Sequence, residues 1–332
     1  MKRMAVLGAG SWGTTLAQVL ALQGHGVSLW ARNAELAGAM ASGRENAAYL
    51  PGVRLSGNLL PTSSLEEALD GARMVVSAIP SHGLRAVFAE AAPLVAPGAV
   101  VVSATKGIEE GTLLLASGVL KEELAHRPGV ELVVLSGPSF AREVSRGLPT
   151  AVCAGSASED AAVAVQRAFS TDYFRVYTNT DVTGVELGGA LKNVIAIASG
   201  ISDGLGLGNN ARAALITRGL AEISRLGVSM GARTATFSGL SGLGDLVLTC
   251  TGALSRNYTV GLEVGKGRSV EDVTGSMRMV AEGVRTSRAA CELARKEGVE
   301  MPITGEICNV LYGGRAPKEA VLELMTRELK GE

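Results

Sequence analysis

The stretch VLGAGSWGTTLAQVL, from Val6 to Leu20, carries glycines at Gly8, Gly10 and Gly13 between an apolar run and a segment with helical spacing. In a turn of this pattern the first glycine permits a tight bend, and the second lets backbone N–H groups approach a pyrophosphate. The third glycine allows the helix and the strand to pack closely. The stretch therefore predicts a dinucleotide site at a helix N-terminus, and a glycine-rich turn without a ligand is the alternative.

The residue that selects the dinucleotide is expected at the end of the second strand, about 20 positions further on. An acidic residue there binds a ribose 2′-hydroxyl, but this chain has Arg32 in the sequence Leu29 to Asn33. A guanidinium suits a 2′-phosphate, so the pattern favours NADP or at least tolerates it. The alternative is that Arg32 is a solvated strand end.

The first part of the chain alternates short β-branched runs with helical patterns, which predicts a mostly parallel sheet covered by helices on both faces. After about residue 180 nearly every segment has helical spacing. We therefore expect an α/β fold, with a Rossmann-type domain over residues 1–180 and an all-helical domain over residues 181–332. The predicted strands are Met4–Leu7, Val27–Trp30, Met74–Ile79, Val100–Ser103, Leu132–Leu135, Ala151–Ala154 and Phe174–Tyr177.

Composition excludes several classes of protein. The 332 residues carry a net charge of −1 without a dominant basic cluster, which gives no support for binding to nucleic acid or an anionic membrane. The N-terminus lacks a secretory pattern, and the apolar stretch from Leu187 to Ile201 contains Lys192 and is too short to span a bilayer. Four scattered cysteines without CxxC spacing predict neither a metal site nor a disulfide. Their pattern is typical of a reducing compartment, so we expect a cytoplasmic location.

Lys192 is the leading candidate for proton transfer, since the chain has only three histidines and none is well placed to act as a base. It is the only charged residue between Glu186 and Asp203. Thr183 and Glu186 form a capping-box pattern that predicts a helix start just before it. Burial of an ammonium group lowers its pKa toward neutrality, which suits general acid–base catalysis. Gly188 and Gly189 would let a ligand or cofactor come close, and a lysine that extends to water is the alternative.

Further candidates follow predicted strands or lie in the helical half. Lys106 ends the segment VVVSATKG, and small or hydroxyl-bearing residues follow the next strand, at the sheet edge where open α/β folds bind ligands. Asp245 lies in an apolar setting and is predicted to pair with one of the lysines, or to cap a helix. Ser-Arg-Asn at the opening of a predicted helix is a candidate phosphate clamp. The candidates after that strand are Gly137, Ser139 and Ala141, and those of the clamp are Ser255, Arg256 and Asn257.

Six segments together resemble NAD(P)-dependent glycerol-3-phosphate dehydrogenase of the bacterial type. They occur in the expected order over essentially the whole chain: GAGSWGT (8–14), SATKGIE (103–109), LSGPSFAREV (135–144), ELGGALKNVIAIASG (186–200), GLGDLVLTCTGALSRNYTVG (242–261) and VAEGVRT (280–286). The resemblance implies a Rossmann domain, a helical substrate domain and a homodimer. It also implies NAD(P)H as cofactor and reversible reduction of dihydroxyacetone phosphate to sn-glycerol 3-phosphate, which supplies glycerophospholipid synthesis.

The resemblance also implies roles for individual residues. Lys192 would donate or accept the proton, with Lys106 and Asp245 beside it in the catalytic group. The substrate would contact Lys106, Gly137, Ser139, Lys192, Asp245, Ser255, Arg256 and Asn257. The cofactor would contact Gly8, Gly10, Ser11, Trp12, Gly13, Arg32, Lys106, Ala141, Arg256, Val280 and Glu282. The alternatives are a related dehydrogenase acting on a hydroxy or oxo acid, and a protein that binds NAD(P) as a sensor without turnover.

Overall fold

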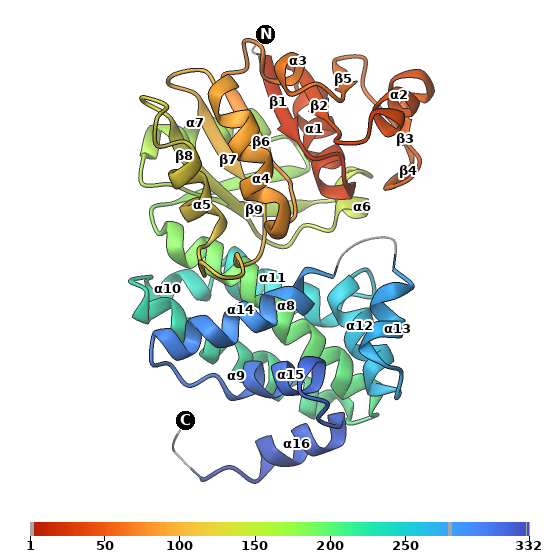
Figure 1. The fold of residues 1–332 in the computed structure, drawn as a ribbon, viewed down its shortest axis with the longest axis vertical. Coiled ribbons are helices and arrows are strands. Elements are labelled where there is room, and N and C mark those ends of the chain that lie inside the picture. The colour runs from red at the N-terminus through yellow and green to blue at the C-terminus, as the bar shows by residue number, and fades with distance from the viewer. Residues whose placement is uncertain (1–2, 278–280, 330, 332) are drawn as a thin grey trace. The chain divides into compact units, whose positions relative to one another are not determined.

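The computed structural model describes residues 3–277, 281–329 and 331, which form two compact units (Figure 1). The first consists of Met1–Lys106 and Leu114–Glu186, and the second of Gly107–Leu113 and Leu187–Glu332. The first unit contains a mostly parallel sheet with helices, and the second is helical. The predicted fold class is therefore confirmed.

The sheet of the first unit has its strands in the order β10-β9-β8-β7-β6-β1-β2-β5. All neighbouring strands are parallel except β8 and β9, which pair antiparallel. The strands are β1 (Arg3–Leu7), β2 (Gly26–Trp30), β5 (Leu59–Thr62), β6 (Met74–Ser77), β7 (Val100–Ser103), β8 (Glu131–Ser136), β9 (Thr150–Gly155) and β10 (Phe174–Asn179). A separate antiparallel pair consists of β3 (Glu45–Asn46) and β4 (Leu50–Arg54).

Strand β1 lies at the point where the strand order reverses. From β1 the chain runs outward through β2 to β5, and then returns to β6 on the other side of β1. The carboxyl ends of β1 and β6 therefore border the crevice in which open α/β sheets bind their ligands. The glycine turn begins directly after β1, at this crevice.

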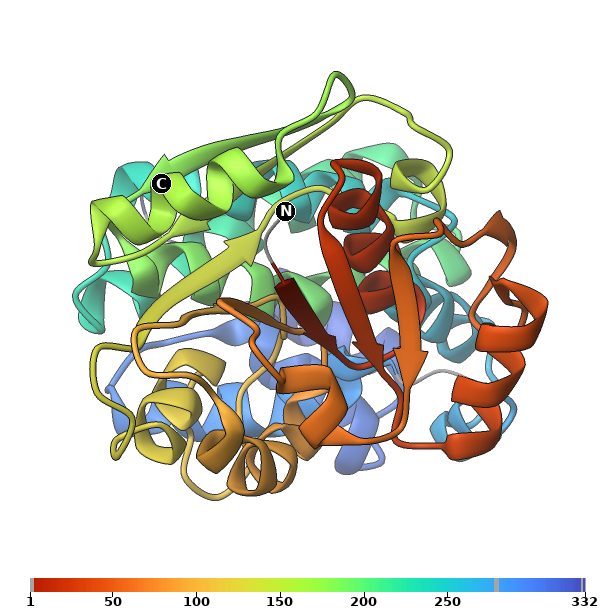
Figure 2. The same cartoon turned by 90° about the horizontal axis from the view of Figure 1, so that it is seen from above.

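Helices cover both faces of the sheet, because successive side chains of a strand point to opposite faces (Figure 2). Met4 and Val6 belong to one core with α1 and α7, and Ala5 and Leu7 belong to the other with α3, α4 and α5. The helices are α1 (Ser11–Leu22), α2 (Ala34–Gly43), α3 (Leu65–Leu69), α4 (Ser81–Ala91), the 3₁₀ turn η1 (Ala92–Leu94), α5 (Ala116–Glu123), α6 (Ala141–Val144) and α7 (Glu159–Phe169).

The second unit is built from helices of uneven length. They are α8 (Val182–Gly204), α9 (Gly208–Ser229), α10 (Thr234–Phe237), the π-helix η2 (Leu240–Gly244), α11 (Asp245–Thr251), α12 (Arg256–Gly265), α13 (Val270–Gly275), α14 (Glu282–Lys296), α15 (Pro302–Tyr312) and α16 (Pro317–Met325). The first residues of α8 belong to the first unit and the remainder to the second. By length and hydropathy α8 could cross a membrane, but its 18-residue apolar window is buried inside the structure, as in a core helix.

The start of α8 differs from the predicted one. The side chain of Asp181 accepts a hydrogen bond from the Gly184 N–H at 2.9 Å, so Asp181 caps the helix and Thr183 lies inside it. Glu186 does not close a capping box. Its carboxylate accepts from the Ser117 backbone N–H at 2.8 Å and from the Ser117 hydroxyl. The pattern at Thr183 and Glu186 therefore placed the helix start correctly to within two residues, for the wrong reason.

Helices α8 and α12 pack with their backbones in contact. A Cβ atom at Gly200 would lie 2.1 Å from the Tyr258 carbonyl oxygen, and one at Gly261 would lie 2.0 Å from the Ile197 carbonyl oxygen. Any side chain at either glycine would force the helices apart. The contact fixes α12 beside the C-terminal part of α8, the helix that carries Lys192.

Candidate functional site

Two glycines of the turn after β1 are required by the protein's own packing. Gly8 has a φ of +110°, and a Cβ there would lie 2.8 Å from the Ala78 carbonyl oxygen at the end of β6. A Cβ at Gly13 would lie only 1.8 Å from the Gly8 carbonyl oxygen. Both positions therefore explain why the chain bends tightly here and why α1 lies close to β1.

Gly10 has a different environment from the other two glycines. Its backbone is extended (φ −73°, ψ −179°), and a Cβ added there would meet no protein atom within 4 Å. It is also the N-cap of α1, where no side chain caps the helix. A glycine that folding does not require, at an uncapped helix N-terminus, fits a site where the pyrophosphate of a dinucleotide approaches the backbone.

A fully buried amide side chain holds this turn in shape. Asn46, at the end of β3, donates from Nδ2 to the Ala9 carbonyl oxygen at 2.9 Å and to Thr14 Oγ1 at 2.8 Å. The Ser11 hydroxyl donates to the Tyr49 carbonyl oxygen at 2.5 Å. Asn46 was not among the predicted site residues, because it lies 32 positions from Thr14 and belongs to no recognisable motif.

The remaining predicted residues of the first unit follow neighbouring strands at their carboxyl ends. Lys106 lies three positions after β7 and is half-buried. Gly137 follows β8 with a φ of +145°, and its carbonyl oxygen accepts from the Ser139 hydroxyl at 3.0 Å. Ala141 begins the short helix α6, and its carbonyl oxygen accepts from Thr15 Oγ1 of α1 at 3.3 Å. The sheet thus brings these residues to the same edge as the glycine turn.

The side chains of Trp12 and Arg32 lie in different surroundings. Trp12 packs against the core, with its ring centroid 6.5 Å from that of Phe174. Arg32 follows β2, is exposed, and forms no ion pair with any residue that the structure describes. A Cβ at Gly83, in the first turn of α4, would lie 3.9 Å from its guanidinium. The Arg32 charge is therefore available to an anionic group of a ligand.

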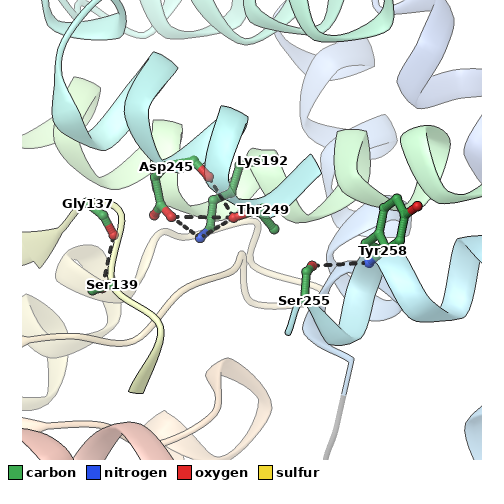
Figure 3. Close-up of polar contacts among 7 residues, drawn as sticks. All are labelled: Gly137, Ser139, Lys192, Asp245, Thr249, Ser255 and Tyr258. Carbon is green, nitrogen blue, oxygen red and sulfur yellow. Dashed lines mark hydrogen bonds and ion pairs between the residues drawn. The ribbon is translucent and has the colours of Figure 1, made fainter. Parts of the chain in front are cut away.

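In the second unit the ammonium group of Lys192 lies in a buried polar group (Figure 3). Lys192 Nζ forms an ion pair with Asp245 and donates to Thr249 Oγ1 at 2.9 Å. The Thr249 hydroxyl in turn donates to the Asp245 backbone carbonyl at 2.6 Å. Lys192 is 6% exposed and Asp245 is 0% exposed, so the lysine does not extend to water. The predicted pairing of Asp245 with a lysine is observed, and its partner is Lys192.

The turn before Asp245 is a π-helix. Leu240–Gly244 forms this wider turn, and α11 begins at Asp245. Single π turns often occur at functional sites. A Cβ at Gly188 would lie 2.6 Å from the Ser241 carbonyl oxygen. Gly188 therefore makes room for the backbone of this turn and not for a ligand, which corrects the prediction.

The Ser-Arg-Asn sequence opens α12, as predicted, but two of its side chains serve the fold. Ser255 is the N-cap, and its Oγ accepts from the Tyr258 N–H at 3.2 Å (Figure 3). Asn257 Oδ1 accepts from the Gly283 N–H at 2.9 Å, which ties α12 to the start of α14. No described group accepts from Asn257 Nδ2. The start of α12 therefore offers three donor groups: the Ser255 hydroxyl, the Asn257 amide and the guanidinium of the exposed Arg256.

Two more predicted cofactor contacts concern the start of α14. Glu282 is its first residue and is half-buried. The adjacent Gly283 sits so close to its neighbours that a Cβ would lie 2.6 Å from the Asn193 carbonyl oxygen. This contact brings α14 next to the residue that follows Lys192. Val280 lies outside the described residues.

Two models of one protein family together match most of the chain. The profile for the N-terminus of NAD-dependent glycerol-3-phosphate dehydrogenase matches residues 3–162, and the profile for its C-terminus matches residues 181–322. The chain belongs to this family. It is 58% identical over 331 residues to glycerol-3-phosphate dehydrogenase [NAD(P)+] of Geobacter sulfurreducens, with 100% of this chain and 99% of the relative covered. It is 56% identical to the enzyme of the same name from Citrifermentans bemidjiense, with the same coverage of both chains.

A solved structure supports the fold assignment. The crystal structure of glycerol-3-phosphate dehydrogenase from Coxiella burnetii superposes with a TM-score of 0.94 at 40% identity. The alignment covers 98% of this chain and 99% of that chain. The chain is thus an NAD(P)-dependent glycerol-3-phosphate dehydrogenase by family. This assignment decides against the alternatives of an oxo-acid dehydrogenase and of a sensor without turnover.

Proposed function

We propose that this member of the family uses NAD(P)H to reduce dihydroxyacetone phosphate reversibly to sn-glycerol 3-phosphate for glycerophospholipid synthesis, with Lys192 as the proton donor. The observation that carries the proposal is the buried group of Lys192, Asp245 and Thr249 on α8 and α11. Even a paired ammonium and carboxylate lose hydration free energy when they are buried, and apolar side chains of similar size would not. A chain that retains such a pair in an apolar helix is therefore expected to use it.

The first unit supplies the cofactor site in this proposal. The turn of Gly8, Gly10 and Gly13 holds the pyrophosphate at the N-terminus of α1, where Gly10 offers open space and α1 has no side-chain cap. Ser11, Trp12 and Ala141 lie beside it. Bound NAD(P)H would supply a hydride to the carbonyl carbon of the substrate.

Lys192 would hold the proton that the carbonyl oxygen takes as it becomes an alcohol. Asp245 and Thr249 each contact Nζ, which reduces the number of orientations that the ammonium group can adopt. The Asp245 carboxylate also balances the ammonium charge within this buried group. Lys106 supplies a second positive charge that would stabilise the developing alkoxide.

The start of α12 would bind the phosphate group. It combines a helix N-terminus, the guanidinium of Arg256, Asn257 Nδ2 and the Ser255 hydroxyl. The phosphate does not react, so its binding energy can be used to orient the ketone. Gly137 and Ser139 would offer further polar contacts to the substrate, and Val280 and Glu282 further contacts to the cofactor. The family resemblance also supports a cytoplasmic homodimer.

The proposal is tested by following oxidation of NADH and NADPH with dihydroxyacetone phosphate. Comparison substrates are a 2-oxo acid, a 3-oxo acid and unphosphorylated dihydroxyacetone. We expect rapid oxidation with the phosphorylated ketone and little with the others. Oxidation of either coenzyme that is faster with an oxo acid, or binding of both without oxidation, would contradict the proposal.

A further inference from the structure

Two of the four cysteines, which lie 17 positions apart in the sequence, meet in the second unit. Cys291 of α14 has its Sγ 3.5 Å from the Thr304 carbonyl oxygen of α15. Cys308 lies one turn after Thr304 on the same helix, and side chains in a helix lean toward its N-terminus. The Cys308 thiol therefore lies next to the Cys291 thiol, and both residues line the same cavity.

Both sulfurs line a cavity of about 240 Å³ between α14, α15 and α16. Gly305 lies in its wall, and a Cβ there would meet no atom within 4 Å. Arg295 and Arg327 also line the cavity, and so do Glu306 and Glu323. Arg327 pairs with Glu300 and Glu306 with Arg315, whereas Arg295 and Glu323 form no ion pair with any residue that the structure describes. The cavity thus combines access to two thiols with side chains of both charges, which suits a small molecule that carries groups of both charges.

The two thiols differ in their readiness to ionise. The adjacent Cys291 thiol, together with Arg288 and Arg295, lowers the pKa of Cys308 to about 7, against the opposing effects of burial and Glu292. The pKa of Cys291 is raised by the adjacent Cys308 thiol, by burial and by Glu222, although Arg295 lowers it. Burial alone raises the pKa of Cys153 to about 11. Only a thiolate attacks a disulfide, so Cys308 is the nucleophile of the pair.

We propose that Cys308 and Cys291 form a reversible thiol–disulfide site that reacts with small disulfides that carry groups of both charges and enter this cavity. The Cys308 thiolate attacks one sulfur of the small disulfide, forms a mixed disulfide and releases one small thiolate. The Cys291 thiol then loses its proton and attacks Cys308 Sγ, which forms the protein disulfide and releases the second small thiolate. The protein dithiol is oxidised by two electrons, and one small disulfide is reduced to two small thiols.

This site is separate from the residues assigned to the proposed function. Neither cysteine contacts Lys192 or any residue of its polar group, and the cavity contains none of the assigned residues. The inference therefore stands whether or not the proposed reaction is correct. Its test needs no turnover.

The experiment exposes the intact protein to glutathione disulfide and follows its mass and its peptides by mass spectrometry. We expect the wild type to lose two hydrogens, with the new disulfide joining the peptides of Cys291 and Cys308. Cys291→Ser should stop at a mixed disulfide on Cys308, and Cys308→Ser should stay unmodified. Cys153→Ser is the matched control and should react as the wild type does. Circular dichroism checks that each variant is folded.

A second measurement uses the wild type alone and so does not depend on variant folding. Alkylation of Cys308 by iodoacetamide should rise with pH to half its maximal rate at about pH 7, far below the value for Cys153. A Cys308→Ser variant that forms glutathione adducts as fast as the wild type would overturn the proposal. So would a wild type that accumulates only the mixed disulfide, or a Cys308 whose alkylation follows that of Cys153.

Discussion

Gly10→Ala should separate cofactor binding from folding. The backbone at Gly10 is extended and suits alanine, and the added methyl group would touch no protein atom within 4 Å. Since alanine loses less backbone entropy on folding than glycine, the free energy of unfolding should stay the same or rise by about 0.4–1 kcal/mol. The same methyl group would occupy the space through which the pyrophosphate approaches the backbone, so cofactor affinity should fall at least ~10-fold, or about 1.4 kcal/mol.

Gly13→Ala is the matched control, because its methyl group would lie 1.8 Å from the Gly8 carbonyl oxygen. It should destabilise the protein by about 1–3 kcal/mol or more, as overpacking in a core does. Urea unfolding measures the stability of both variants, and fluorescence titration with NADH and NADPH measures their affinities. A Gly10→Ala variant that binds both coenzymes as tightly as the wild type would refute the dinucleotide assignment of this turn. Destabilisation as large as that of Gly13→Ala would refute the claim that folding does not require Gly10.

Three further predictions concern the phosphate, the coenzyme and pH. Arg256→Ala should raise KM for dihydroxyacetone phosphate at least ~10-fold, because a charge-assisted hydrogen bond to the phosphate is lost. Turnover of unphosphorylated dihydroxyacetone should stay unchanged, and an equal effect on both ketones would contradict the role of Arg256 in phosphate binding. Arg32→Ala should raise KM for NADPH and not for NADH in initial-rate assays, and an equal rise for both would contradict a 2′-phosphate contact. Burial raises the pKa of Glu186 from 4.5 to about 7, so the free energy of unfolding should fall as pH rises between these values. Urea unfolding of the wild type should show that the free energy of unfolding falls by about 3 kcal/mol over this pH range, and the Glu186→Gln variant should lack this fall. Identical pH profiles for the two proteins would refute the prediction.

The parts of the fold that were predicted are those with strong local signals. Every predicted strand is present, because β-branched runs bounded by turns mark buried parallel strands. The strand β5 was missed, since its sequence contains Pro61, and proline argues against a strand. The structure places β5 at the edge of the sheet, where a missing N–H is tolerated.

The site was predicted only as far as single residues carry chemical information. Lys192 was identifiable because it is a charge within an apolar helix, but its partner Asp245 lies 53 positions away. Packing between helices, and not any local pattern, brings the two together. The same holds for Asn46, whose role depends on the tertiary position of the β3–β4 pair. Gly188 was misjudged because a glycine in a sequence does not reveal whether protein or ligand fills the space beside it.

The most direct test of the central claim measures kcat for reduction of dihydroxyacetone phosphate by the Lys192→Met variant. Because this change leaves the Asp245 carboxylate buried without its cation, it should destabilise the fold by about 3–5 kcal/mol. Lys192→Met/Asp245→Asn removes both charges and should recover most of that stability. We predict that kcat falls at least ~10²-fold in both variants while NADH affinity in the folded protein is unchanged. A double variant that is stable, binds NADH and turns over at nearly the wild-type rate would contradict the assignment of Lys192 as the proton donor.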